Sequence, residues 1–226
     1  MERIIVISLG GSIIIPDKID VNFLKGFKKI IIDFVEKGNK AIIVCGGGKT
    51  CRRYQDAAAK VSNLRNEDLD WIGIHTTRLN AQLIKTLFLG IVNEKVIHNP
   101  NEKIDFKEKV LIAAGWKPGF STDYDAVRLA KNFNVKTVVN MSNIAYVYDK
   151  DPNGNDDARP IKKISWKDFR KIVGDKWDPG FNAPFDPIAA REAEKLGLKV
   201  IILKGTDLAN FKNFLDEKEF NGTVIS

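Results

Sequence analysis

Several short stretches of this chain are almost wholly apolar and rich in β-branched residues, and helical patterns separate them. The expected strands are residues 3–9, 41–45, 109–113, 135–141 and 198–203, with a short terminal strand over 222–225. A strand without polar positions must be covered on both faces, as in a parallel sheet packed between helices. The alternation therefore predicts one α/β domain spanning residues 1–226.

Capping residues and glycines mark the helices between these strands. Asp20 is the expected N-cap of the first helix, and Thr122 or Asp123 is the expected cap of the helix that holds Ala126. Further helices are expected to start near Lys49, at residue 67, after Ser165, at Pro187 and near Asp207. The helix from residue 67 is predicted to reach residue 90, and the Gly-Gly-Ser at 10–12 is predicted to be a sharp exit from the first strand. Asp186 before Pro187 is typical of an N-cap and a first helical residue, which already gives Asp186 a structural role.

The charge balance is mildly basic. Lys and Arg number 36 against 29 for Asp and Glu, which gives a formal net charge of +7. Charged residues are spread along the whole chain, so the excess indicates a basic surface that favours anionic partners. Because there is no clustered basic arm or aromatic-interleaved patch, a nucleic-acid partner is not expected.

Cysteine usage and the N-terminus bear on the compartment. The cysteines are Cys45 and Cys51, and a chain with 44% hydrophobic residues needs no disulfide to build its core. Two cysteines and two distant histidines also make a poor ligand set, so no protein-bound metal is expected. The apolar N-terminal run lacks a signal peptide's cationic start, and no stretch approaches the roughly 20 apolar residues of a membrane span. We expect a soluble, cytoplasmic protein without a membrane partner.

Three of the expected strands end in loops that suit phosphate groups: Gly-Gly-Ser at 10–12, Gly-Gly-Gly-Lys at 46–49 and the segment 115–123. Ligands of open α/β sheets bind beyond the carboxyl ends of the strands, and glycine lets backbone N–H groups approach an anion. Neither glycine cluster has P-loop or dinucleotide-binding spacing, so an ordinary tight turn stays an alternative for each.

Basic residues follow the triple glycine. Lys49, Arg52 and Arg53 fall in the first turns of the expected helix, where a guanidinium can bind a phosphate through two hydrogen bonds. A solvated helix face is the alternative, and it is favoured more for Arg53 than for Arg52.

Longer motifs carry a family resemblance. They are GGGKTCRRY (46–54), DWIGIHTTRLNA (70–81), PGFSTDYDA (118–126), VYDKDP (147–152) and DPIAA (186–190). Their order and spacing resemble the amino-acid kinase superfamily, and within it the archaeal-type uridylate (UMP) kinases, from Ile4 to Ile225. The resemblance implies a three-layer αβα sandwich with a mainly parallel central sheet and a homohexamer. It also implies transfer of the γ-phosphoryl group of ATP, with Mg²⁺, to UMP.

The resemblance further implies roles by motif position. Ser8, Leu9, Gly10, Gly11 and Ser12 would hold the ATP phosphates, and Ser142, Asn143, Tyr148 and Asp151 would line the ATP base and ribose. Gly48 and Arg52 would lie near the transferred group, and the expected catalytic residues are Gly10, Lys49, Arg52 and Asp123. Gly47 would lie against UMP, Asp70 would bind its ribose hydroxyls, and Lys117, Pro118, Gly119, Phe120, Ser121 and Thr122 would surround its phosphate and uracil. Acceptor binding would occupy roughly residues 1–135 and nucleotide binding roughly 136–226.

Some of these residues have structural alternatives: Asp123 as a plain N-cap, Tyr148 as a packed aromatic and Asp70 as a helix-surface charge. Phosphoryl transfer between anions needs positioning and charge neutralisation rather than a general base. His75 and His98 are therefore expected to be structural or surface residues.

The chain departs from the family pattern before its first glycine loop. Ser8 stands where many members carry a lysine. The missing positive charge would then come from Lys49, Arg52 or Lys117 together with Mg²⁺, which is a hypothesis.

A second departure lies in the expected nucleotide half. Ala145 and Tyr146 stand where the family usually has Asp and Gly. A tyrosine ring at a glycine position would reshape the ATP pocket or stack on the base.

Two other functions stay open. One is a sister kinase acting on isopentenyl phosphate or an aminomethylfuran phosphate, which the absence of a histidine from GGGKTCRRY and the intact Asp70 motif disfavour. The other is a non-catalytic nucleotide-binding or storage homologue, which the departures at Ser8, Ala145 and Tyr146 motivate. Turnover and ATP binding would separate these possibilities.

Overall fold

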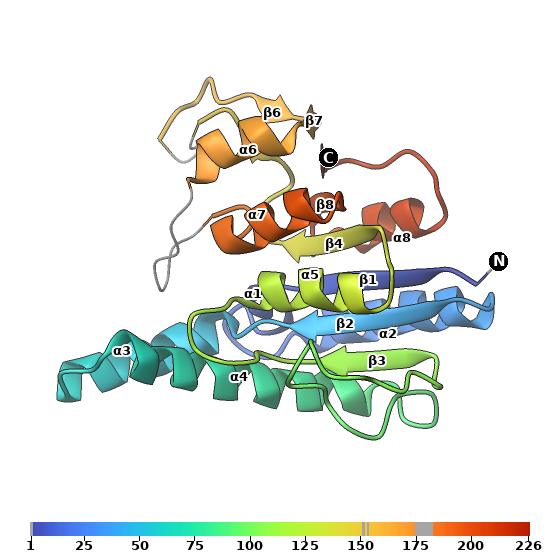
Figure 1. Ribbon diagram of the computed structural model, residues 1–226, viewed down its shortest axis with the longest axis horizontal. Helices are drawn as coiled ribbons and strands as arrows, with labels where there is room; N and C mark the ends of the chain where they lie inside the picture. The colour runs from blue at the N-terminus through green and yellow to red at the C-terminus, as the bar shows by residue number, and fades with distance from the viewer. Residues whose placement is uncertain (1, 151, 153, 175–182) are drawn as a thin grey trace.

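A sheet of seven strands in the order β3-β2-β1-β4-β8-β9-β7 runs through the middle of the protein. The structure is a computed structural model, which describes residues 2–150, 152, 154–174 and 183–226 (Figure 1). The strands are β1 (Ile4–Leu9), β2 (Lys40–Cys45), β3 (Val110–Ala113), β4 (Thr137–Ser142), β5 (Val147–Tyr148), β6 (Pro160–Ile161), β7 (Lys163–Ile164), β8 (Lys199–Lys204) and β9 (Thr223–Ile225). The helices are α1 (Gly11–Ile14), α2 (Val21–Glu36), α3 (Gly48–Val61), α4 (Asn66–Thr86), α5 (Thr122–Asn132), α6 (Trp166–Val173), α7 (Pro187–Lys195) and α8 (Leu208–Leu215).

The pairing of the central strands is parallel, as their apolar sequences predict. β1 pairs in parallel with β2 and β4, β2 with β3, and β4 with β8. In this sheet the strand direction changes between β8 and β9, which run antiparallel to each other. The predicted α/β class with a mainly parallel sheet is therefore confirmed.

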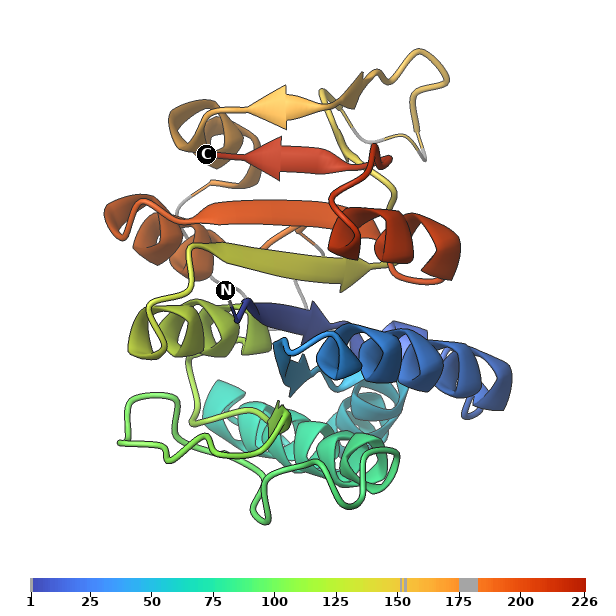
Figure 2. The same cartoon turned by 90° about the vertical axis from the view of Figure 1, so that its right-hand side faces the viewer.

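Each strand divides its side chains between two cores. Ile5, Ile7 and Leu9 pack on one face with α2, α4 and α8, whereas Val6 packs on the other face with α5, α6 and α7. Figure 2 shows these layers edge-on, with α2 and α8 on one side of the sheet and α5 and α7 on the other. The continuous apolar strands follow from this arrangement, since both faces of the sheet are covered.

The structure corrects several local expectations. The Gly-Gly-Ser at 10–12 leads into the short helix α1 instead of a simple sharp exit, and the helix predicted to reach residue 90 ends at Thr86. Ser121 caps α5 by accepting a hydrogen bond from the Tyr124 N–H, so neither Thr122 nor Asp123 is the cap. The two-stranded ribbon of β5 and β6 was not predicted, because strands of two residues carry no periodicity.

Other caps agree with the sequence. The side chains of Asp20, Ser165, Asp186 and Asp207 each accept a hydrogen bond from a backbone N–H in the first turn of α2, α6, α7 and α8. Cys45 and Cys51 are both free thiols. In the described part of the chain, no helix is both long and apolar enough to cross a membrane.

The packing of α2 and α8 against the sheet generates a stability prediction. Phe27 is fully buried and its ring lies 5.7 Å from that of Phe23 and 6.1 Å from that of Phe211. We expect Phe27→Ala to lower the free energy of unfolding by about 3–5 kcal/mol, since it removes buried area and leaves a cavity. Urea unfolding measures this loss. Ile19→Ala, at a side chain 47% exposed, is the control, and equal effects of the two changes would contradict the assigned core.

Candidate active site

The loops singled out in the sequence meet at one edge of the sheet. β2, β1 and β4 are parallel neighbours that end at Cys45, Leu9 and Ser142, and β3 ends beside them at Ala113. This carboxyl edge lies at the left of Figure 1, where α3 and the segment before α5 emerge. The predicted donor and acceptor loops are therefore adjacent in space, as the ligand-binding edge of an α/β sheet requires.

The two glycine loops touch each other through their backbones. A Cβ atom on Gly11 would lie 2.3 Å from the Gly48 nitrogen and 2.4 Å from the Gly46 oxygen, so no larger residue fits there. Gly48 has a φ of 66°, in the left-handed region that favours glycine. The Gly46 N–H donates to the Leu9 oxygen at 2.9 Å. Glycine at these positions is thus required by the contact between the loops.

The side chain of Asn80 on α4 is hydrogen-bonded to the triple-glycine loop. Its buried Nδ2 donates to the Gly46 oxygen at 2.7 Å and to the Gly47 oxygen at 3.3 Å. The DWIGIHTTRLNA motif contains Asn80, but its role was not predicted. With two carbonyl oxygens held by one amide, the loop has a fixed orientation toward β1.

The basic residues after this loop differ in their surroundings. Arg52 Nη2 lies 3.2 Å from Ser12 Oγ, so its guanidinium reaches across to the first glycine loop. Arg53 turns away and pairs with the exposed Asp17, which fits the solvated-face interpretation favoured for it. Lys49 is exposed on the first turn of α3.

Asp123 occupies the centre of the edge. Its Oδ1 accepts hydrogen bonds from Ser8 Oγ at 2.8 Å and from Asn140 Nδ2 at 3.4 Å, and its Oδ2 accepts from the Asp186 N–H at 3.2 Å. These bonds join β1, β4, α5 and the start of α7. Since Ser121 is the cap, Asp123 has no capping function to explain its position.

Two further carboxyl groups lie near Asp123. Asp125 is 1% exposed and Asp186 is 5% exposed. Burial raises the pKa of Asp123 and raises that of Asp125 well above its ordinary value, and the negative neighbours Asp123 and Asp186 add to the effect on Asp125. Burial, with a smaller contribution from Asp123, raises the pKa of Asp186 to about 6. The cluster is therefore a site where negative charge is costly, which favours bringing cations near it.

The segment 115–119 is held at both ends by side chains of α4 and α5. Thr77 Oγ1 accepts from the Gly115 N–H at 2.8 Å, and Asp125 Oδ2 accepts from the Trp116 N–H at 3.1 Å. Asp70 Oδ2 accepts from the Gly119 N–H at 2.8 Å. Asp70 therefore lies against the predicted acceptor segment, while the contributions of Thr77 and Asp125 were not predicted.

Aromatic rings cover this segment. The Phe120 ring lies 5.2 Å from that of Trp116 and 4.5 Å from that of Tyr124. The Lys117 ammonium is 4.1 Å from the Trp116 ring centroid and 5.3 Å from that of Phe120. A cation held over aromatic faces beside exposed backbone is suited to a ligand that combines a phosphate with a flat ring.

The predicted nucleotide-side residues lie at the end of β4 and beyond. Ser142 Oγ and Asn143 Oδ1 are 3.2 Å apart, and Tyr148 belongs to β5. Asp151 lies outside the described residues. Tyr146 donates from its hydroxyl to Asn221 Oδ1 at 3.1 Å, which fixes its ring beside the segment before β9.

One basic residue at this edge was missed by the sequence analysis. Lys204 ends β8 directly opposite Ser142 in the parallel register, and it is exposed. A lysine at the carboxyl end of a buried strand next to a predicted nucleotide loop was the signal that could have identified it. His75 and His98 are exposed, as expected. In the described ranges, no set of three His, Cys, Asp or Glu side chains is arranged to hold a metal ion.

The amino acid kinase family profile matches residues 3–204 of this sequence. This chain belongs to the amino acid kinase family. Its relatives include the uridylate kinase of Thermoplasma volcanium, 34% identical over 221 residues that cover 96% of this chain and 95% of the relative. The uridylate kinase of Sulfolobus acidocaldarius is 33% identical and covers 88% of each chain. The crystal structure of uridylate kinase from Archaeoglobus fulgidus superposes with a TM-score of 0.84, at 28% identity, over 99% of this chain and 100% of that one.

The glycine contact in this amino acid kinase can be tested directly. We expect Gly11→Ala to lower the free energy of unfolding by about 1–3 kcal/mol, because the added methyl group overlaps backbone atoms of the second loop. Gly154→Ala is the matched control, since a Cβ there has open space. Urea unfolding of both variants measures the difference. Equal stability of the two variants would show that the loops are not in contact.

The buried acid of α7 gives a pH-dependent prediction. The raised pKa of Asp186 means that the folded protein binds a proton more tightly than the unfolded chain, so stability falls as the pH rises from about 4 to about 6. We expect Asp186→Asn, which keeps a cap, to remove this fall. Relative to the wild type, the variant should gain about 2 kcal/mol in free energy of unfolding between pH 4 and pH 7.5.

Urea unfolding of the wild type and D186N at both pH values measures this change. The same exchange at the exposed cap of α8, D207N, controls for the altered capping group. A difference between wild type and D186N that does not vary with pH would refute the assignment.

Proposed function

We propose that this protein catalyses the ATP-dependent phosphorylation of UMP to UDP. An oxygen of the acceptor phosphate would attack the γ-phosphorus of ATP in line, and ADP would leave. The observation that carries the proposal is the similarity to uridylate kinases over nearly the whole chain, 34% identity over 96% of it for the Thermoplasma volcanium protein. The carboxyl edge described above supports it, because backbone-rich loops and cations gather there.

The donor side of the reaction is assigned to the two glycine loops and their neighbours. Ser8 to Ser12 would bind the ATP phosphates, and Arg52, already beside Ser12, would neutralise charge on the transferred group. Lys49 and Gly10 would lie nearby, and Asp123 would orient these groups through Ser8 and Asn140. Ser142, Asn143, Tyr148 and Asp151 are proposed for the ATP base and ribose.

The acceptor side is assigned to segment 117–122 with Gly47 and Asp70. One oxygen of Asp70 holds the Gly119 N–H, and its Oδ1 accepts no hydrogen bond within the described part of the chain. That oxygen would accept a ribose hydroxyl. The Lys117 ammonium over Trp116 would attract the acceptor phosphate.

Mg²⁺ would arrive with the phosphates of ATP and would supply neutralising positive charge. Asp123, Asp125 and Asp186 each accept a hydrogen bond from a backbone or hydroxyl donor, while Asp125 Oδ1 and Asp186 Oδ2 are buried without a partner and would face a cation brought in with the phosphates. The described residues form no metal-binding cluster of their own. Mg²⁺ is commonly held by substrate phosphates with few protein ligands.

The assembly is proposed to be a homo-oligomer, with a hexamer implied by the family. Trp71 and Leu79 of α4 are 38% and 65% exposed, which leaves apolar area available for a subunit contact. Two free thiols fit a reducing, cytoplasmic environment.

The activity is tested by incubating the protein with Mg-ATP and, separately, UMP, CMP, AMP, isopentenyl phosphate or no acceptor. ADP and UDP formed in equal amounts, in the UMP reaction alone, are the expected result. Turnover with another acceptor would make the protein a sister kinase. ATP binding without turnover in any reaction would make it a non-catalytic homologue.

The cation assignment gives a mutational prediction. We expect Arg52→Met to lower kcat by about 10²–10³-fold, because it removes a charge-assisted contact to the transferred group. Lys49→Met tests the second cation in the same way. Arg53→Met is the matched control at the next position, where the side chain pairs with Asp17 instead. Equal rates for R52M and R53M would remove Arg52 from the site.

A further inference from the structure

A cavity of about 710 Å³ lies at the amino ends of β1, β4 and β8, on the opposite edge of the sheet from the glycine loops. We call it the amino-edge cleft, and it includes Lys136, Lys163 and Lys199 with apolar residues of β8, α8 and β9. Its volume is within the range of small-molecule sites. The six residues of β1 separate it from the catalytic edge by roughly 20 Å at about 3.3 Å per residue.

The three lysines come from different segments and have no counter-charge. Lys136 precedes β4, Lys163 lies in β7 and Lys199 begins β8. Lys136 and Lys199 are neighbours, since the Lys199 N–H donates to the Lys136 oxygen at 2.9 Å. Within the described residues, no carboxylate lies within ion-pair distance of any of the three ammonium groups. Uncompensated like charges in a concave site raise the local concentration of anions.

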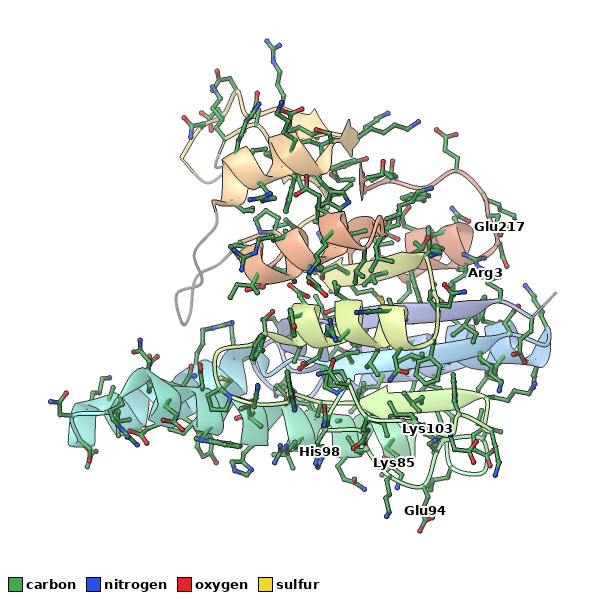
Figure 3. All side chains as sticks on the ribbon, in the orientation of Figure 1. Arg3, Lys85, Glu94, His98, Lys103 and Glu217 are labelled. Carbon is green, nitrogen blue, oxygen red and sulfur yellow. The ribbon has the colours of Figure 1, made fainter. Side chains whose placement is uncertain are left out.

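The other charged groups of the cleft leave its excess of positive charge in place. Two carboxylates line it, the side chain of Glu2 and the terminal carboxylate of Ser226, and both residues are exposed and form no ion pair with the three lysines. Arg3 is already engaged, because its Nη1 lies 2.9 Å from the Leu215 oxygen and 3.3 Å from Glu217 Oε1. Arg3 and Glu217 are both labelled in Figure 3. The cationic character of the cleft therefore comes from the lysines.

An apolar wall faces the lysines. Phe214 and Phe220 pack edge to face with ring centroids 5.2 Å apart, and Val224 and Ile201 continue the wall along β9 and β8. The Arg3 guanidinium lies 5.7 Å from the Phe214 ring and helps to fix it. A ligand that fills the cleft would therefore combine an anionic group with a flat or aliphatic body.

We propose that the amino-edge cleft is a binding site for a small molecule that carries a phosphate ester or anhydride on an aromatic or aliphatic body. The site is separate from the phosphoryl-transfer site, and the proposal does not depend on the identity of the acceptor there. Lysine ammonium groups bind phosphate through charge-assisted hydrogen bonds, and the aromatic residues of the cleft would contact the body attached to it.

Pyridoxal 5′-phosphate is a suitable probe, because its phosphate and ring have the stated chemistry. Its aldehyde condenses with a nearby lysine amine with loss of water, and borohydride reduces the imine to a stable amine. The intact protein, with no nucleotide added, is labelled briefly, reduced, digested and mapped by mass spectrometry, which tells the cleft lysines apart from lysines of the opposite edge. We expect Lys136, Lys163 or Lys199 to be modified roughly tenfold faster than the exposed Lys25 and Lys195. This readout is independent of kinase activity.

The variant K163Q/K199Q provides the second test, and it changes exposed residues outside the catalytic edge. It should unfold like the wild type and label Lys136 no faster than Lys25. Competition then distinguishes the ligand: protection by both UTP and phenyl phosphate indicates any aromatic phosphate, and protection by UTP alone indicates a nucleotide. Labelling of the cleft lysines at the rate of Lys25, or no protection by either compound, would overturn the proposal.

Discussion

The close approach of Gly11 to the backbone of Gly46 and Gly48 is the contact on which the arrangement of loops at the carboxyl edge depends. It is possible only because β1 and β2 are adjacent parallel strands that end at the same level, so that two loops leave the sheet side by side. Any side chain at Gly11 would separate the loops. The buried amide of Asn80 then holds the second loop from the helix beneath it. Because both faces of the sheet are covered by helices, backbone N–H groups are accessible to a ligand in the loops at this edge.

Three acids lie together at this edge, where burial favours their neutral forms. Asp123, Asp125 and Asp186 lie close together with limited access to water, and their raised pKa values show that the environment resists negative charge. A site of this kind gains from every cation brought into it, whether from arginine, lysine or a metal carried by a nucleotide. At the end of β1, the Ser8 hydroxyl donates a hydrogen bond to Asp123 but brings no positive charge to the cluster, so the cations must come from elsewhere.

The sequence predicted the architecture because burial on both faces leaves a signal at every strand position. It also placed the loops at one edge, since parallel strands bring their carboxyl ends together. It could only favour Arg52 over Arg53 weakly, because the choice depends on Asp17, which is remote in sequence from both. The role of Asp125 was not predicted for a similar reason. Its partner is the backbone N–H of Trp116, and a contact with the backbone of another segment leaves no pattern of residue types in the sequence.

The start of α5 contacts both the proposed acceptor segment and the strand that precedes the proposed donor loop. Ser121 closes the acceptor segment, and two residues later Asp123 reaches Ser8 beneath the donor loop. No flexible linker intervenes, so a movement of the segment that tightens it around one substrate also moves the carboxylate that serves the other. If both assignments hold, any coupling between the affinities for the two substrates through this connection must be equal in both directions.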